Sequence, residues 1–265
     1  MALALPGSQF IARFILDHGI SGDVLTLGKQ GVPITLDKYR SFLMTLFESY
    51  RPDNSRQSET ELQHLVDKMR KEGTLASTLP GTNPDFISDH FFFRALGMRS
   101  VKSIDVDLSE GADYQANLNF AGSFSDELGR EFDLLYDGGT LEHVFHLPNA
   151  LANIHKVVKP GRHIIHFNPM NNDPDHGFYQ FSPTFYHDYY QANDFKIVRM
   201  FIFRIAGNAL HDPYMVMQYE PGSLDTAAAQ IFGDGSMYYN GVFVQKLAHS
   251  TSDRVPEQSI FSRYK

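Results

Sequence analysis

Apolar residues recur at helical spacing through most of the first hundred positions of the chain. They form one face of a segment over 8–18, where Ser8 is suited to cap the first turn. The same spacing predicts helices over 36–50, 62–69 and 85–96. This part of the chain is therefore expected to be mostly helical, apart from one short buried strand.

The spacing of apolar residues changes after residue 100, where short apolar runs alternate with helical segments. The predicted strands are 23–28, 101–105, 114–118, 132–136, 163–167, 195–205 and 241–247. The clearest helix, 148–158, has Pro148 in its first turn and stops at a Lys-Pro-Gly sequence, and another helix is expected near 183–192. Strands that alternate with helices are typical of an α/β fold with a doubly wound, mostly parallel sheet. The pattern thus predicts a seven-stranded sheet, and its last two strands are suited to form an antiparallel hairpin.

The segments that connect these elements indicate the domain organisation. No linker rich in Gly, Ser or Pro separates two halves, so we expect a single domain over 1–265. A helical insertion over about 36–97 separates the first two strands and is interpreted as a lid or a dimer arm. A loop insertion is expected over about 206–240. The run Phe91–Phe93 is expected to pack in the core or at an interface.

Composition narrows the range of partners. The net charge is −8 and the basic residues are scattered, which argues against a nucleic-acid or anionic-membrane partner. The chain has no cysteine, so disulfides, thiolate nucleophiles and Cys-based zinc sites are excluded. The first residues lack the basic start of a signal peptide, and no apolar run reaches the roughly 18 residues of a membrane span. We expect a cytoplasmic protein that acts on a small molecule, and its aromatic-rich insertion is compatible with a homodimer.

Polar residues follow the predicted strands at the points where a ligand would bind. In an open α/β sheet, ligands bind at the carboxyl ends of the strands, where the strand order reverses. Gly28 lets the backbone turn tightly there, and a carboxylate such as Asp105 can accept both hydroxyl hydrogens of a ribose. The amides around Asn117 can read an adenine edge. The candidate cofactor-binding residues are Gly28, Asp105, Asp107, Asn117, Leu118, Asp137 and Gly138.

Three neighbouring segments carry a resemblance to a known family. They read FDLLYDGGTLEHV over 132–144, PNALANIH over 148–155 and VKPG over 158–161. In this order they resemble motifs IV to V of the class I (Rossmann-like) S-adenosylmethionine-dependent methyltransferases, and a looser likeness extends over 21–30 and 100–247. The resemblance implies a Rossmann-like methyltransferase fold with S-adenosyl-L-methionine as the cofactor.

The cofactor loop departs from the family pattern. Thr26 stands where an acidic residue is common, and only Gly28 and Gly31 remain of the usual glycines. In the family that acid helps to hold the amino group of the cofactor. Either another residue supplies this contact, or the cofactor binds weakly.

The loop from 168 to 183 is dense in Asn, His, Tyr and Gln and has few permanent charges. It suits a neutral hydroxylated acceptor, such as a sugar or a natural-product scaffold, so methylation of an oxygen is favoured over methylation of a nitrogen. His176 is the predicted general base, because an imidazole with a pKa of about 6.5 can take a hydroxyl proton near neutral pH. The candidate catalytic residues are His176 and His143, and the candidate substrate-binding residues are Asn171, Tyr179 and Gln180.

Two other functions stay open on the sequence. The thinned glycine loop is compatible with a catalytically inactive, methyltransferase-like binding or scaffold protein. The histidines between 143 and 187 are compatible with a metal-dependent hydrolase. However, His163 and His166 should point to opposite faces of one strand, and His143 and His146 could share an ion only on a helix. No His-Glu-x-x-His motif exists, and we predict no metal ligands.

Overall fold

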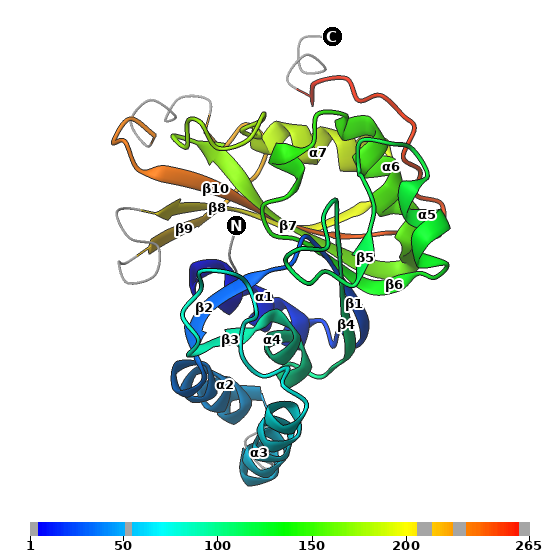
Figure 1. Cartoon of the computed structure of the whole chain (residues 1–265). Helices are drawn as coiled ribbons and strands as arrows, with labels where there is room; N and C mark the ends of the chain where they lie inside the picture. The colour runs from blue at the N-terminus through cyan, green and yellow to red at the C-terminus, as the bar shows by residue number, and fades with distance from the viewer. Residues whose placement is uncertain (1–4, 51–54, 206–213, 225–231, 260–265) are drawn as a thin grey trace.

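The computed structural model describes residues 5–50, 55–205, 214–224 and 232–259. Eight of its strands form one sheet in the order β5-β4-β1-β6-β7-β10-β8-β9 (Figure 1). They are β1 (Gly22–Leu27), β4 (Met98–Asp105), β5 (Tyr114–Gln115), β6 (Phe132–Asp137), β7 (Val158–Asn171), β8 (Lys196–Ile205), β9 (Tyr214–Gln218) and β10 (Met237–Gln245). The strands from β5 to β7 are parallel to one another, while β10 runs antiparallel to β7 and β8, and β9 antiparallel to β8. The chain thus has the doubly wound, mostly parallel sheet that the sequence predicts.

Helices cover both faces of this sheet. On one face lie α1 (Leu5–Asp17) and α4 (Asp89–Ala95), and on the other lie α5 (Ser123–Leu128), α6 (Leu147–Val157) and α7 (Pro183–Ala192) (Figure 1). Helices α2 (Leu36–Tyr50) and α3 (Ser55–Lys71) lie beyond α4, farther from the sheet. Each layer buries its own apolar cluster against the sheet. Among the described helices, none combines the length and the apolar character that a membrane crossing needs.

The predicted helix and strand faces follow from local sequence. Helix α6 carries Pro148 in its first turn and buries Leu151, Ile154 and Val157, as its helical spacing predicts. In β7, the ring of His163 packs against Phe14 of α1, whereas His166 contacts α7 on the opposite face. The two histidines therefore cannot share an ion, which confirms the prediction from strand alternation.

The insertion over 36–97 is built of several elements. It contains α2, α3, the short strand β3 (Phe86–Ser88) and α4, and β3 pairs antiparallel with β2 (Gly31–Thr35) in a separate two-stranded sheet. Neither short strand shows in the apolar pattern of the sequence. The side chains of Phe91–Phe93 are fully buried in the core, as predicted, and α4 packs on β4 of the main sheet. The end of this insertion is therefore a sheet-covering helix.

The sheet has one strand more than the sequence predicts. The expected loop insertion over 206–240 contains β9, which pairs with the edge strand β8, and its last residues already belong to β10. The segments 206–213 and 225–231 of that prediction lie outside the described residues. The five-residue run of β9 is too short to be told from a loop by its pattern, and its neighbour β8 supplies the hydrogen bonds that make it a strand. The strand predicted over 114–118 is also shorter, since β5 ends at Gln115.

Candidate active site

A cavity of about 280 Å³ opens at the carboxyl ends of β1, β4, β5 and β6. The chain passes from β1 outward to β4 and β5, and then returns to β6 on the other side of β1. The cavity therefore lies at the point where strand order reverses, which is where open α/β sheets bind ligands. Gly28 lines it from β1, Asp105 from β4, and Thr140 with His143 from the turn after β6.

Gly28 and Asp105 meet at the floor of this cavity. Gly28 has a φ of +72°, and a Cβ at this position would lie 3.5 Å from Oδ2 of Asp105 and 3.2 Å from Oγ1 of Thr140. The other carboxylate oxygen of Asp105 accepts the backbone N–H of Val106 at 2.6 Å. None of the described residues donates a hydrogen bond to Oδ2, so this oxygen is available to a ligand that approaches the Gly28 backbone.

Asn117 and Leu118 also line the cavity, in the segment that follows β5. The side-chain oxygen of Asn117 accepts the backbone N–H of Asn119 at 3.0 Å, and the side-chain oxygen of Asn119 accepts the N–H of His146, also at 3.0 Å. These bonds tie the loop after β5 to the start of α6. Asn119, one of the amides that the sequence predicts near an adenine edge, also lines the cavity.

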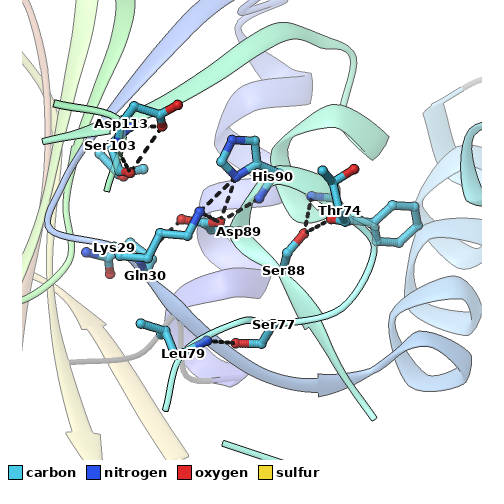
Figure 2. A network of polar contacts seen from close by, with 12 residues as sticks. Lys29, Gln30, Thr74, Ser77, Leu79, Ser88, Asp89, His90, Ser103 and Asp113 are labelled. Carbon is cyan, nitrogen blue, oxygen red and sulfur yellow. Dashed lines mark hydrogen bonds and ion pairs between the residues drawn. The ribbon is translucent and has the colours of Figure 1, made fainter. Parts of the chain in front are cut away.

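A buried ion pair stands beside the cofactor loop, and the sequence gives no sign of it. Lys29 Nζ lies 2.9 Å from Asp89 Oδ1 and 3.0 Å from Nδ1 of His90, and the backbone N–H of Gln30 donates to Asp89 Oδ2 (Figure 2). Burial alone would raise the pKa of Asp89, but the hydrogen bond with His90 and the charge of Lys29 outweigh it, so this pKa is lowered. Asp89 comes from the far end of the insertion, so only folding brings it to Lys29 and Gln30, which line the cavity.

Thr26 occupies the place of the missing acidic residue, and its side chain bonds to the backbone of the same loop. Its hydroxyl donates to the carbonyl of Gly28 at 3.0 Å. Gln30 donates from its amide nitrogen to the carbonyl of Leu27 at 2.7 Å, while its amide oxygen is buried and has no hydrogen-bond partner among the described residues. That oxygen lies beside Gly138, where a Cβ would be 2.5 Å from it, and Gly138 does not line the cavity.

Three of the predicted cofactor contacts lie away from the cavity wall. Asp137 is fully buried and accepts the backbone N–H groups of Thr140 and Leu141, so it shapes the turn after β6. Gly138 is buried, and it is its neighbour Gly139 that reaches the cavity. Asp107 is exposed and closes its own turn, because the backbone N–H and the hydroxyl of Ser109 donate to it and lower its pKa.

Glu142, His143 and His176 form a cluster at the edge of the cavity. Glu142 and His143 belong to the 3₁₀ turn η2 (Leu141–His143), and His176 lies in the loop after β7. The rings of the two histidines are 4.9 Å apart, and Nε2 of His176 lies 3.5 Å from Oε1 of Glu142. Burial raises the pKa of Glu142 to about 7, and the carboxylate of Asp137 adds to this shift. The two predicted catalytic histidines are thus neighbours, and the buried Glu142 of the same polar turn lies beside them.

A buried polar network supports this cluster from the side of α7. Oε2 of Glu142 accepts the side-chain N–H of Asn168 at 2.9 Å, and Tyr186 donates to the oxygen of Asn168 at 2.6 Å. In parallel, His166 bonds to Asp137 at 2.8 Å and to Tyr190. The carboxylates of Glu142 and Asp137 are therefore held in fixed orientations.

The predicted acceptor-binding residues take part mainly in shaping the loop. Tyr179 donates its hydroxyl to the carbonyl of Phe145 at 2.9 Å, and the side-chain oxygen of Gln180 accepts the N–H of Asp173 at 3.1 Å. Asn171 pairs with β10 at the end of β7. None of these three residues lines the cavity described above.

Exposed aromatic rings lie on the segments that surround the cavity. Phe145 and Phe178 make an edge-to-face contact with ring centres 5.6 Å apart, and both are largely exposed. Phe120, also exposed, follows the cavity-lining Asn119. Large apolar side chains left in solvent near a cavity indicate a surface that contacts a ligand or a partner.

The sequence matches no protein-family model and no curated protein. Among solved structures it is similar to TehB from Haemophilus influenzae, with 11% identity, a TM-score of 0.37, and 76% of this chain covering 65% of TehB. It is also similar to the StiE O-MT structure, with 14% identity, a TM-score of 0.40, and coverage of 92% of this chain and 76% of the other. The N-methyltransferase NodS from Bradyrhizobium japonicum WM9 is 10% identical, with a TM-score of 0.38 and coverage of 90% of this chain and 94% of NodS.

The fold class follows from the topology of the chain itself. The strand order, the two helical layers and the cavity at the carboxyl ends of the strands give a doubly wound, Rossmann-like α/β fold. The low identities and TM-scores of the similar structures identify no particular activity. The reaction is therefore inferred from the site alone.

Proposed function

We propose that the protein is an S-adenosylmethionine-dependent methyltransferase that acts on a small hydroxylated acceptor, with transfer to oxygen favoured over transfer to nitrogen. The observation that carries this proposal is the meeting of Gly28 and the free oxygen of Asp105 in the cavity at the strand-order reversal. A backbone that a ligand can approach closely, beside a carboxylate that can accept two hydroxyl hydrogens, suits a nucleoside.

The remaining cavity residues fit the other parts of this cofactor. Asn117 and Leu118 line the cavity and are suited to contact an adenine. S-adenosyl-L-methionine supplies an electrophilic methyl group bonded to a sulfonium.

The cluster of Glu142, His143 and His176 lies at the edge of the cavity, and we assign it to the acceptor side of the reaction. In such a transfer the protein mainly aligns the acceptor, excludes water and removes a proton. We assign proton removal to this cluster, with His176 as the group that faces the acceptor hydroxyl and Glu142 behind it. The exposed rings of Phe145 and Phe178 offer contact area for an acceptor that is apolar apart from its hydroxyl groups.

The test is calorimetric titration of the purified protein with S-adenosylmethionine and S-adenosylhomocysteine, repeated on Asp105→Asn. The substitution keeps the shape of the side chain and removes its charge. We expect binding to weaken by about tenfold or more, because a hydrogen bond to a charged group contributes about 1.5–3 kcal/mol. Asp67→Asn is the control, since Asp67 lies on α3 in an ion pair at 3.5 Å with Arg70, remote from the cavity.

Wild-type binding that Asp105→Asn weakens and Asp67→Asn preserves would support the cofactor site and justify a screen of acceptors. If the wild type binds neither compound, the methyltransferase proposal fails. A methyltransferase-like binding or scaffold protein would then become the leading reading, because the thinned glycine loop already departs from the family pattern.

A further inference from the structure

Two buried polar atoms of the Glu142, His143 and His176 cluster have no hydrogen-bond partner among the described residues. They are Oε1 of Glu142 and Nε2 of His176, and they lie 3.5 Å apart. The side chain of Glu142 has no exposed surface. A buried carboxylate oxygen without a donor is costly, because water can no longer solvate it. A single cation that approaches both atoms would satisfy them together.

The geometry of the cluster is that of a ligand set. One donor atom from each of Glu142, His143 and His176 lies within 4.8 Å of the other two. The sequence paired His143 with His146 by spacing, and that pair does not form this set. Instead the fold brings His176 from a loop far along the chain. A carboxylate oxygen and two imidazole nitrogens around one point can hold a cation.

The loop that carries His176 is fastened to Glu142 by its backbone. The N–H groups of Phe178 and Tyr179 both donate to the carbonyl of Glu142, at 2.6 and 3.2 Å. Gly177, with a φ of +77°, packs so closely that a Cβ there would lie 2.7 Å from that carbonyl oxygen. The position of His176 relative to Glu142 is therefore set by the main chain.

Glu142 is also oriented by a hydrogen bond to its other carboxylate oxygen. Its Oε2 accepts a hydrogen bond from Asn168, which is itself fixed by Tyr186. Partners of this kind orient the ligands of metal sites and raise their affinity. The remaining oxygen, Oε1, is the one that points toward His176 and has no partner.

We propose that Glu142, His143 and His176 bind one divalent first-row transition ion at the edge of the cavity. Two imidazoles and one carboxylate suit Zn²⁺ or Fe²⁺ and leave coordination positions open. Mg²⁺ and Ca²⁺ prefer sets made of oxygen atoms and are not expected to bind.

The role of the ion rests on the proposed function. An acceptor hydroxyl that reaches an open coordination position becomes more acidic and loses its proton to solvent. The resulting oxygen attacks the methyl carbon of the cofactor, a new C–O bond forms, and the C–S bond breaks with its electron pair staying on sulfur. With the ion bound, His143 and His176 are its ligands. The proton of the acceptor hydroxyl then goes to solvent and not to His176.

Ion binding is tested on the untagged full chain after treatment with EDTA and removal of the chelator. Zn²⁺ is titrated calorimetrically, and Co²⁺ is added in parallel to record its visible absorption, which reports coordination geometry. The variants are His176→Ala and Glu142→Gln, and His146→Ala is the matched control. His146 is exposed, lies on the same segment, and its side chain makes no capping hydrogen bond.

We expect one equivalent of Zn²⁺ to bind with micromolar affinity or better, and no binding of Mg²⁺. Affinity should fall by more than about tenfold in His176→Ala and Glu142→Gln and stay unchanged in His146→Ala. Circular dichroism checks that the buried Glu142→Gln variant folds, and the loop variant His176→Ala carries the test if it does not. Absence of stoichiometric binding in the wild type, or equal affinity in His176→Ala, would overturn the proposal.

The same preparations are titrated with S-adenosylmethionine. Zn²⁺ binding without cofactor binding would keep the metal site and reject the methyltransferase. Cofactor binding without Zn²⁺ binding would do the reverse, so the two proposals can fail separately.

Discussion

The buried imidazole of His163 should make the stability of the protein sensitive to mild acid. Its side chain lies between β7 and α1, 8% exposed, with its ring 5.7 Å from that of Phe14 and 6.0 Å from that of His18. Burial lowers the pKa of His163 from 6.5 to about 4, and the positive charges of His18 and Arg162 add to the shift. Its Nδ1 is buried and has no hydrogen-bond partner among the described residues.

The sign and size of the effect follow from these two pKa values. Between pH 6.5 and pH 4 the unfolded chain binds a proton at this position and the folded chain does not, so stability is complete above pH 6.5 and falls as the pH is lowered. The difference between the two pKa values of His163 corresponds to a total loss of about 3 kcal/mol in the free energy of unfolding. Between pH 7 and pH 5 the expected loss from this group is about 2 kcal/mol.

The assay is urea unfolding at pH 7 and pH 5 of the wild type and of His163→Leu, which cannot be protonated. The variant should lose about 2 kcal/mol less than the wild type over this interval. His64→Leu, at an exposed position of α3, is the control and should keep the wild-type loss. Equal losses in the wild type and in His163→Leu would show that His163 is not held neutral by burial, and the reasoning would be refuted.

Two glycine substitutions test the proposed cofactor site and the proposed metal site without changing a charged residue. Gly28→Ala should cost about 1–2 kcal/mol for its positive φ. It should also weaken cofactor binding, because the new methyl group crowds Thr140 and occupies cavity space beside Asp105. Gly73→Ala, with a φ of +69° and open space around it, should affect stability alone. Equal cofactor affinity in both variants, measured by calorimetry, would contradict this. Gly177→Ala should displace the His176 loop and weaken Zn²⁺ binding, while Gly235→Ala, with a φ of +76° and no near neighbour, should leave Zn²⁺ binding intact. Unchanged Zn²⁺ affinity in Gly177→Ala would argue against the proposed ligand geometry.

Local pattern was sufficient to predict the elements that bury a regular apolar face. Helices α6 and α7 and strands β1, β4 and β6 lie close to their predicted positions. Strands β2, β3 and β9 were missed because each is short and is defined by hydrogen bonds to a strand elsewhere in the chain. Pattern carries no information about such pairing.

The residues of the candidate site also divide into those that the sequence places correctly and those that it does not. Gly28, Asp105 and Asn117 could be named from the sequence because each directly follows a strand, and parallel strands end at one edge of a sheet. Asp137 and Gly138 also follow a strand, but the turn after β6 directs them into the protein. Position along the chain places a residue near the edge of the sheet, and the turn conformation sets which way its side chain points.

The sequence alone thus indicates the α/β fold and the edge of the sheet where a ligand is expected, because periodicity is a local property and parallel strands end at one edge. The pairing of Asp89 with Lys29, and of His176 with Glu142, belongs to the tertiary structure. Each pair joins segments far apart in the chain, and its geometry depends on how the insertion and the loop after β7 pack. Because burial also raises the pKa of Glu142 and lowers that of His163, the chemistry of these groups is set by the fold and not by their residue types.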